Sequence, residues 1–160
     1  ARRELEASLV IAGHPTGVDP ASLETRAAGL GVGGDVVVAP GYLPMCEVGP
    51  LLRTADVVVL PYRSATASGV LQTAYAFSRP VIVTDVGGLP EAVVDGGTGL
   101  VVPAGDVAAL ARALVKVLGD PAEAARMGAE GRRLAEQEHG WTTVAERVGR
   151  VCEHIAGGAA

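Results

Sequence analysis

The chain has 160 residues, a hydrophobic content of 49% and a formal net charge of −5, which predict one compact domain with its own apolar core. The acidic balance and the scattered arginines argue against a nucleic acid as the partner, because binding a phosphate backbone requires clustered basic side chains. No apolar run approaches the roughly 20 residues that a membrane-spanning helix needs.

Short apolar runs rich in β-branched residues predict five strands, at 8–13, 35–39, 56–61, 80–85 and 98–103. Because these runs are apolar throughout, we expect parallel strands that are buried on both faces beneath helices. Helical spacing appears between the strands at 20–30, 48–55 and 68–78, and the segment before the last strand holds at most a short helix.

After residue 103 the pattern changes to three successive helices, at 105–120, 121–137 and 141–156. Asp106 precedes the first of them, and Asp120 before Pro121 precedes the second, and both are typical helix starts. The whole pattern predicts an α/β fold: a doubly wound parallel sheet with helices on both faces, ending in three helices.

Ligands of such sheets bind beyond the carboxyl ends of the strands, and the loop YRSATASG at 62–69 has the best chemistry for an anion. Ser68 and Gly69 stand at a helix start, where free N–H groups and the positive end of the helix dipole attract negative charge. Ser64 and Thr66 add hydroxyl groups nearby. The alternative is that Ser68 only caps the helix and needs no ligand.

Several common sites are not supported by the sequence. It contains neither the Gly-x-Gly-x-x-Gly of a dehydrogenase nor a Walker-type phosphate loop, and Ser68 does not stand in a Gly-x-Ser-x-Gly nucleophile turn. The three histidines have no metal-ligand spacing, so no metal is expected. His14, at the end of the first strand, could bond a substrate or be a solvated loop residue. Cys46 and Cys152 predict no disulfide and a reducing, cytoplasmic setting.

Residues 84–114, TDVGGLPEAVVDGGTGLVVPAGDVAALARAL, resemble the carboxyl-terminal domain of the retaining glycosyltransferases of the GT-B fold, the large family with a Glu-x7-Glu signature. Further similarity to the family lies in SLVIAGHP, APGYLPMCEVGPLLRTADVVVLPYRSA and HGWTTVAERVGRV. The family has two Rossmann-like domains, of which the second mainly holds the nucleotide-sugar donor and the first mainly holds the acceptor. The resemblance therefore implies that residues 1–160 form a single nucleotide-sugar-binding domain, a fragment without its first strand and without the N-terminal acceptor domain.

The resemblance also implies a function for the full-length protein. It would transfer a sugar from a nucleotide-diphosphate sugar to an acceptor hydroxyl with retention at the anomeric carbon, as a hexosyltransferase-type enzyme without a metal or another cofactor. The absent N-terminal domain would bind the acceptor, which is a sugar, a lipid or a small molecule. The expected location is the cytoplasm of a bacterium, or the inner face of its membrane through that domain.

The family's two glutamates fall on Ala65 and Thr73 when the segment between Pro61 and Pro80 is matched without gaps, so the chain resembles a subgroup that lacks both. The sequence identifies no catalytic residue. Arg63 is the basic residue closest to the expected phosphate site. The resemblance assigns the donor diphosphate to Thr66, Ser68, Gly69 and Val70, the ribose to Gln72 and Thr73, the rim of the nucleobase site to Gly41, Tyr42 and Leu43, and the remaining rim to His14, Ser64, Asp85, Gly87 and Gly88.

Two other functions remain open from the sequence. A nucleotide-sugar epimerase shares the two-domain fold and would interconvert UDP-sugars without any acceptor. The chain could also be a non-catalytic nucleotide-binding or interaction module. In that case the absence of the two glutamates would mean that catalytic activity has been lost. Because it has no acceptor domain, the isolated chain is expected to be inactive whether the full-length protein is a glycosyltransferase or an epimerase.

Overall fold

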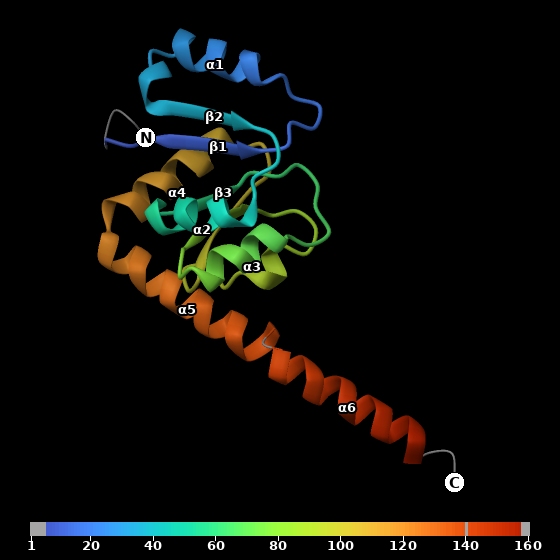
Figure 1. Cartoon of the computed structure of the whole chain (residues 1–160). Coiled ribbons are helices and arrows are strands. Elements are labelled where there is room, and N and C mark those ends of the chain that lie inside the picture. Colours follow the sequence, from blue (N-terminus) through green and yellow to red (C-terminus); the bar gives the residue numbers. More distant parts are fainter. Residues whose placement is uncertain (1–5, 140, 158–160) are drawn as a thin grey trace. The chain divides into compact units, whose positions relative to one another are not determined.

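The computed structural model of the chain describes residues 6–139 and 141–157 (Figure 1). The fold divides into two compact units, residues 1–54 and 55–160. The single domain expected for residues 1–160 stays a prediction. Within the described residues, no helix is long and apolar enough to cross a membrane.

The first unit contains a parallel two-stranded sheet, in which β1 (Leu9–Gly13) pairs with β2 (Val36–Pro40). The connecting helix α1 (Pro20–Gly29) packs on β2, and a short 3-10 turn, η1 (Gly33–Asp35), leads into that strand (Figure 1). Asp19 caps α1 by accepting a hydrogen bond of 3.2 Å from the Ala21 amide. Helix α2 (Met45–Thr54) follows β2.

Two expectations for this unit were wrong. The strands are not buried on both faces, since Leu9, Val10 and Val37 are 48%, 45% and 56% exposed. Of the two helices in this unit, α1 packs on β2 whereas α2 does not pack extensively on either strand, so part of the sheet stays exposed. Helix α2 begins three residues earlier than expected, because the Pro44 carbonyl already accepts the Glu47 and Val48 amides and so closes a first turn.

The second unit contains a parallel three-stranded sheet in the order β3 (Val58–Leu60), β4 (Val81–Thr84) and β5 (Gly99–Val102). Helix α3 (Gly69–Ala76) connects β3 to β4, and a 3-10 turn, η2 (Pro90–Ala92), lies between β4 and β5. Three helices end the chain: α4 (Val107–Gly119), α5 (Pro121–His139) and α6 (Trp141–Gly157).

The predicted parallel strands and the three final helices are therefore confirmed. The two predicted helix starts are also confirmed, because the Asp106 carboxylate accepts the Ala109 amide at 2.8 Å and the Asp120 carboxylate accepts the Glu123 amide at 3.0 Å. These bonds satisfy amides of the first helical turn that have no partner within the helix.

The central strand β4 separates two apolar clusters, and all four of its residues are buried. Val81 and Val83 pack with Leu71 and other residues on the α3 side, whereas Ile82 packs with a cluster that includes residues of α4 and α5. Alternate residues of a strand point to opposite faces, so helices cover both faces of this sheet. That is the arrangement that the continuous apolar run predicts.

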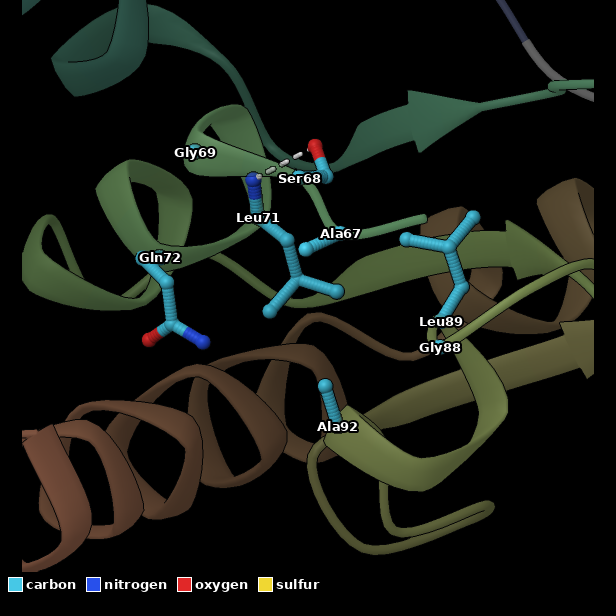
Figure 2. Close-up of a pocket in the computed structure, with 8 residues that line it drawn as sticks. All are labelled: Ala67, Ser68, Gly69, Leu71, Gln72, Gly88, Leu89 and Ala92. Carbon is cyan, nitrogen blue, oxygen red and sulfur yellow. Dashed lines mark hydrogen bonds between the residues drawn. The ribbon is translucent and has the colours of Figure 1, made fainter. Parts of the chain in front are cut away.

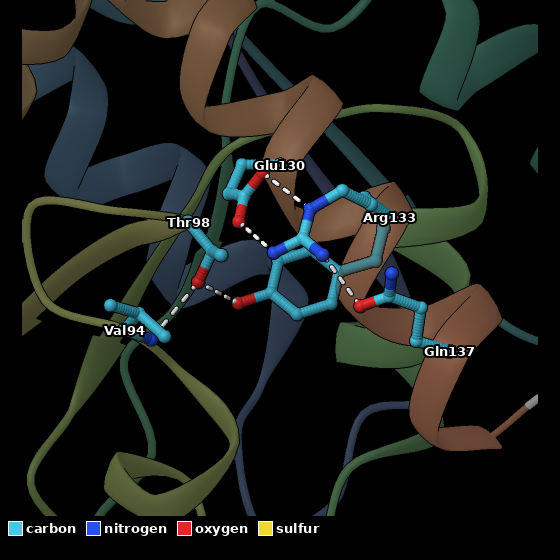
Figure 3. Close-up of polar contacts among 6 residues, drawn as sticks. Val94, Thr98, Glu130, Arg133 and Gln137 are labelled. Carbon is cyan, nitrogen blue, oxygen red and sulfur yellow. Dashed lines mark hydrogen bonds and ion pairs between the residues drawn. The ribbon is translucent and has the colours of Figure 1, made fainter.

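Helix α5 packs closely against α3 because Gly131 has no side chain: a Cβ there would lie 2.4 Å from Cδ1 of the Tyr75 ring. The Tyr75 hydroxyl is bonded to the Thr98 hydroxyl at 2.6 Å, and Thr98 also accepts the Val94 amide at 3.0 Å (Figure 3). Burial raises the pKa of Tyr75, and the bond to Thr98 opposes this shift. On the exposed face of α5, Arg133 bonds Glu130 and Gln137 (Figure 3).

Candidate functional site

The candidate site begins at the start of α3, beyond the carboxyl end of β3. Ser68 is the N-cap, with an extended backbone (φ −133°, ψ 112°), and its hydroxyl oxygen accepts the Leu71 amide at 3.3 Å. The capping role considered for Ser68 is therefore present. The Gly69 and Val70 amides precede the first intrahelical hydrogen bonds and are not bonded to any other described residue. They remain available to an external acceptor at the positive end of the helix.

The approach to these two amides is open. A Cβ placed on Gly69 would have no atom within 4 Å, and the Val70 side chain is 48% exposed. The three hydroxyl residues differ, since Ser64 and Thr66 are exposed whereas Ser68 is partly buried by its cap. An anion could therefore reach the backbone without displacing any side chain.

A cavity of about 190 Å³ adjoins this helix start (Figure 2). Its lining is formed by Ala67, Ser68, Gly69, Leu71, Gln72, Gly88, Leu89 and Ala92. The side-chain oxygen Oε1 of Gln72 is buried and has no hydrogen-bond partner in the described part of the chain. A buried amide oxygen without a donor carries a cost in free energy, so Gln72 is a locally strained position beside the cavity.

The structure brings together the predicted diphosphate loop and the predicted rim after β4. The Gly88 amide donates to the Thr66 carbonyl at 3.0 Å. Gly87 has a φ of +55°, and a Cβ there would lie only 1.6 Å from the Ala65 carbonyl oxygen. The Asp85 carboxylate accepts the Ala104 amide at 2.7 Å and so joins the loop after β4 to the loop after β5.

The two residues predicted for the ribose are adjacent but face different surroundings. The Thr73 hydroxyl donates to the Gly69 carbonyl at 2.7 Å, which leaves its oxygen lone pairs for a ligand. Gln72 is among the residues that line the cavity and is partly buried. Both ribose assignments stay predictions.

The remaining predicted rim residues belong to the first unit. His14 directly follows β1 and is exposed, and the Gly41 amide donates to the Gly13 carbonyl at 2.9 Å. The structure thus places His14 and the segment 41–43 at the same edge of the two-stranded sheet. Tyr42 is 82% exposed, and Leu43 is partly buried. Their roles at a nucleobase or rim stay predictions.

Sequence reasoning missed the apolar part of the cavity, formed by Ala67, Leu71, Leu89 and Ala92. It also missed Thr84, which is 4% exposed and whose hydroxyl donates to the Tyr62 carbonyl at 2.7 Å. The available signal for Thr84 was a single hydroxyl at the end of the most apolar strand. A buried hydroxyl must find a partner, but the sequence does not say which one.

The remaining groups considered from the sequence are the basic residue Arg63, metal ligands and the two cysteines. Arg63 is exposed in the loop after β3. Among the residues that the structure describes, no three His, Cys, Asp or Glu side chains gather as a metal site, and Cys46 and Cys152 are exposed free thiols.

Comparison with known proteins identifies the family. Residues 1–120 match the family model described as glycosyl transferases group 1. The chain is 40% identical over 149 residues to a D-inositol 3-phosphate glycosyltransferase of Streptomyces avermitilis, which covers 90% of this chain and 32% of that protein.

Solved structures share the fold. Sucrose-phosphate synthase from Thermosynechococcus elongatus superposes with a TM-score of 0.78 at 29% identity, over 94% of this chain and 38% of that one. The HepE protein of Anabaena, solved in complex with UDP, gives a TM-score of 0.77 at 18% identity over 92% of this chain and 41% of its own.

These likenesses confirm the predicted α/β fold, which is that of the Rossmann-like carboxyl-terminal domain of GT-B enzymes. The chain spans 32% to 41% of the length of these three proteins. The family match extends over three quarters of the chain, from residue 1 to residue 120. The chain therefore belongs to the glycosyl transferases group 1 family.

Proposed function

We propose that this chain binds the nucleotide-diphosphate sugar donor of a retaining glycosyltransferase, and that the start of α3 holds the diphosphate. The observation that carries the proposal is the pair of unbonded amides at Gly69 and Val70, with open space around Gly69. Backbone amides at a helix start favour phosphate oxygens through hydrogen bonds and through the helix dipole. The site also stands where parallel sheets bind ligands, beyond the carboxyl end of a strand.

Hydroxyl groups would complete the phosphate site. The Ser68 oxygen accepts the Leu71 amide, so its own hydrogen remains free to donate to a phosphate oxygen. Thr66 and Ser64 are exposed in the same loop. The ribose would bond Gln72 and Thr73, near the loop of Asp85, Gly87 and Gly88. The roles of Gly41, Tyr42, Leu43 and His14 at the nucleobase and rim stay predictions from the sequence.

In this proposal the amides also assist the reaction. When the bond between the anomeric carbon and the diphosphate oxygen breaks, negative charge grows on the leaving diphosphate. Donors that already point at that position stabilise the charge without reorganising. The acceptor oxygen then bonds the anomeric carbon on the face that the diphosphate leaves, which retains the configuration, and the proton of the acceptor hydroxyl passes to an oxygen of the leaving diphosphate. We infer that the amides make a metal ion unnecessary.

The relatives support the general class of reaction. The Streptomyces relative is named as a glycosyltransferase, and the Anabaena protein was solved with UDP. Because the chain spans only about a third of its Streptomyces relative, the acceptor is assigned to another part of the full-length protein. We propose a bacterial enzyme that acts in the cytoplasm or at the inner face of the membrane on a sugar, a lipid or a small molecule.

The Gly69→Ala variant tests the binding site. An added methyl group meets no protein atom within 4 Å, so the fold should tolerate it. It would stand in the path of the phosphate, and we expect nucleotide affinity to fall about tenfold or more, equivalent to the loss of roughly 1.4 kcal/mol of binding free energy. Calorimetric titration with UDP, GDP and ADP measures the affinity, and urea unfolding measures the stability.

Gly119→Ala is the matched control, since a Cβ on Gly119 at the end of α4 also meets no atom within 4 Å. This variant should bind the nucleotide like the unchanged chain. Equal affinity in Gly69→Ala, Gly119→Ala and the unchanged chain would contradict the proposed phosphate site.

Turnover assays on the full-length protein distinguish the three candidate functions. Release of nucleotide diphosphate that depends on an acceptor supports transfer. Interconversion of UDP-sugars alone indicates an epimerase, and binding without turnover indicates a non-catalytic module.

A further inference from the structure

Thr84, the last residue of the central strand β4, is one of two buried polar residues in the described part of the second unit. Its hydroxyl lies next to the segment that follows β3. It donates to the Tyr62 carbonyl at 2.7 Å, with the Leu60 carbonyl at 3.5 Å as a weaker second acceptor. Thr84 therefore bonds the chain at the point where β3 ends and the loop 62–68 begins.

A second attachment holds the same loop four residues later. The Gly88 amide donates to the Thr66 carbonyl at 3.0 Å. Between the two hydrogen bonds, Gly87 lies so close to the Ala65 carbonyl that a Cβ would approach its oxygen to 1.6 Å. The last residue of β4 and two residues after it thus contact three positions of the loop.

This loop ends at Ser68, which caps α3 and precedes the unbonded amides of Gly69 and Val70. A shift of the Tyr62 carbonyl would be transmitted through a segment of six residues to the helix start. Hydrogen bonds of well-defined geometry at both ends of a loop reduce the conformations that it can adopt before a ligand arrives.

We propose that Thr84 is a positioning residue, whose buried hydroxyl holds the loop 62–68 so that the Gly69 and Val70 amides face the phosphate site. The inference rests on the proposed function for its consequence in binding, but the geometry of the loop can be tested without a ligand. Thr84 does not contact the donor in this account. It acts mainly through its hydrogen bond to the Tyr62 carbonyl.

The test compares Thr84→Val with Thr84→Ser in the 160-residue chain. Valine preserves the shape of the side chain and removes the donor, whereas serine keeps the hydroxyl. Thr98→Val is the matched control, because Thr98 is also fully buried and loses the same group, but its hydroxyl bonds Tyr75 and Val94 and not the loop 62–68.

The first readout is hydrogen exchange of the Leu71 and Gly88 amides, which bond Ser68 and Thr66 of the loop. After correction for the measured stability of each variant, we expect Thr84→Val to speed this exchange about five- to tenfold, the effect of one lost hydrogen bond. Thr84→Ser should restore slow exchange, and Thr98→Val should not accelerate it. The second readout is nucleotide affinity, which should fall by a similar factor in Thr84→Val only.

Equal corrected exchange in Thr84→Val and Thr98→Val would overturn the positioning role, and so would failure of serine to restore it. If the unchanged chain binds none of UDP, GDP and ADP, the proposed function fails instead, and the exchange measurement still decides whether Thr84 holds the loop. Faster exchange together with unchanged affinity would contradict the link between the loop and the phosphate site.

Discussion

The backbone at Gly87 combines a left-handed conformation with a direct approach to another loop. Its φ is +55°, and a Cβ would lie 1.6 Å from the Ala65 carbonyl oxygen. Gly96 has a similar φ of +72°, but no atom lies within 4 Å of its Cβ position. Substituting each glycine by alanine therefore distinguishes two effects on stability: the strain of a left-handed backbone, present at both positions, and the clash with the Ala65 carbonyl, present only at Gly87.

We predict that Gly96→Ala lowers the free energy of unfolding by about 1 kcal/mol, the cost of a side chain in the left-handed region. Gly87→Ala should cost about 2–5 kcal/mol, because overpacking adds roughly 1–3 kcal/mol to the same strain. Urea unfolding of both variants measures the difference. If both variants lose the same free energy of unfolding, the loop 62–68 can move away from Gly87 at little cost, and the segment after β4 does not hold it.

Individual site residues could be predicted only where their chemistry is local. Ser68 and Gly69 follow from a hydroxyl and a glycine before a helix pattern, and the N-cap geometry confirms that start. Thr84 could not be predicted, because its partner Tyr62 is 22 residues away and depends on how β4 extends past the end of β3. Strand register is set by the whole sheet and is not visible in either segment alone.

At the scale of elements, the close packing of α5 on α3 depends on a glycine inside a helix. A Cβ on Gly131 would lie 2.4 Å from Cδ1 of Tyr75, which is itself 1% exposed. Gly149 occupies the interior of α6, where a Cβ meets nothing within 4 Å. The same substitution should therefore have opposite effects in the two helices.

Gly131→Ala should reduce the free energy of unfolding by about 1–3 kcal/mol through overpacking against the ring. Gly149→Ala should raise the stability of α6 by about 0.5–1 kcal/mol, because alanine is the better helix former. Thermal unfolding followed by circular dichroism compares the two. A stabilised Gly131→Ala variant would show that α5 does not need this close approach.

The elements themselves were predictable to different degrees. The run at 80–85 correctly predicts a strand buried on both faces, because helices cover both sides of β4. The equally apolar runs at 8–13 and 35–39 form strands that remain exposed, since apolar composition does not reveal how many elements are available to cover a sheet. The early start of α2 depends on the Pro44 carbonyl, whose hydrogen bonds have no distinct sequence signal.

For the whole molecule, the buried tyrosine predicts how stability changes at high pH. The pKa of Tyr75 is raised by burial, so the folded chain keeps the phenol neutral at a pH where the unfolded chain ionises it. The contribution of the neutral phenol to the free energy of unfolding is complete below the unfolded pKa of about 10. It is lost as the pH rises through the folded pKa, by up to about 1.4 kcal/mol per pH unit.

Urea unfolding between pH 8 and pH 11 should show this loss in the unchanged chain and a smaller one in Tyr75→Phe. Tyr42→Phe is the control for removing a phenol hydroxyl at an exposed position, since Tyr42 is 82% exposed. A Tyr75→Phe variant with the same pH dependence as the unchanged chain would contradict the role given to burial.

The central claim concerns the start of α3, and a two-dimensional NMR titration of the chain with UDP, GDP and ADP tests it most directly. The account predicts that at least one nucleotide shifts the Ser68, Gly69 and Val70 amides in a saturable way, and that the Gly119 amide does not move. It also predicts that Gly69→Ala weakens that response. If every amide of residues 64–70 stays in place with all three nucleotides, or if Gly69→Ala responds like the unchanged chain, α3 does not bind the donor diphosphate and the proposed site is wrong.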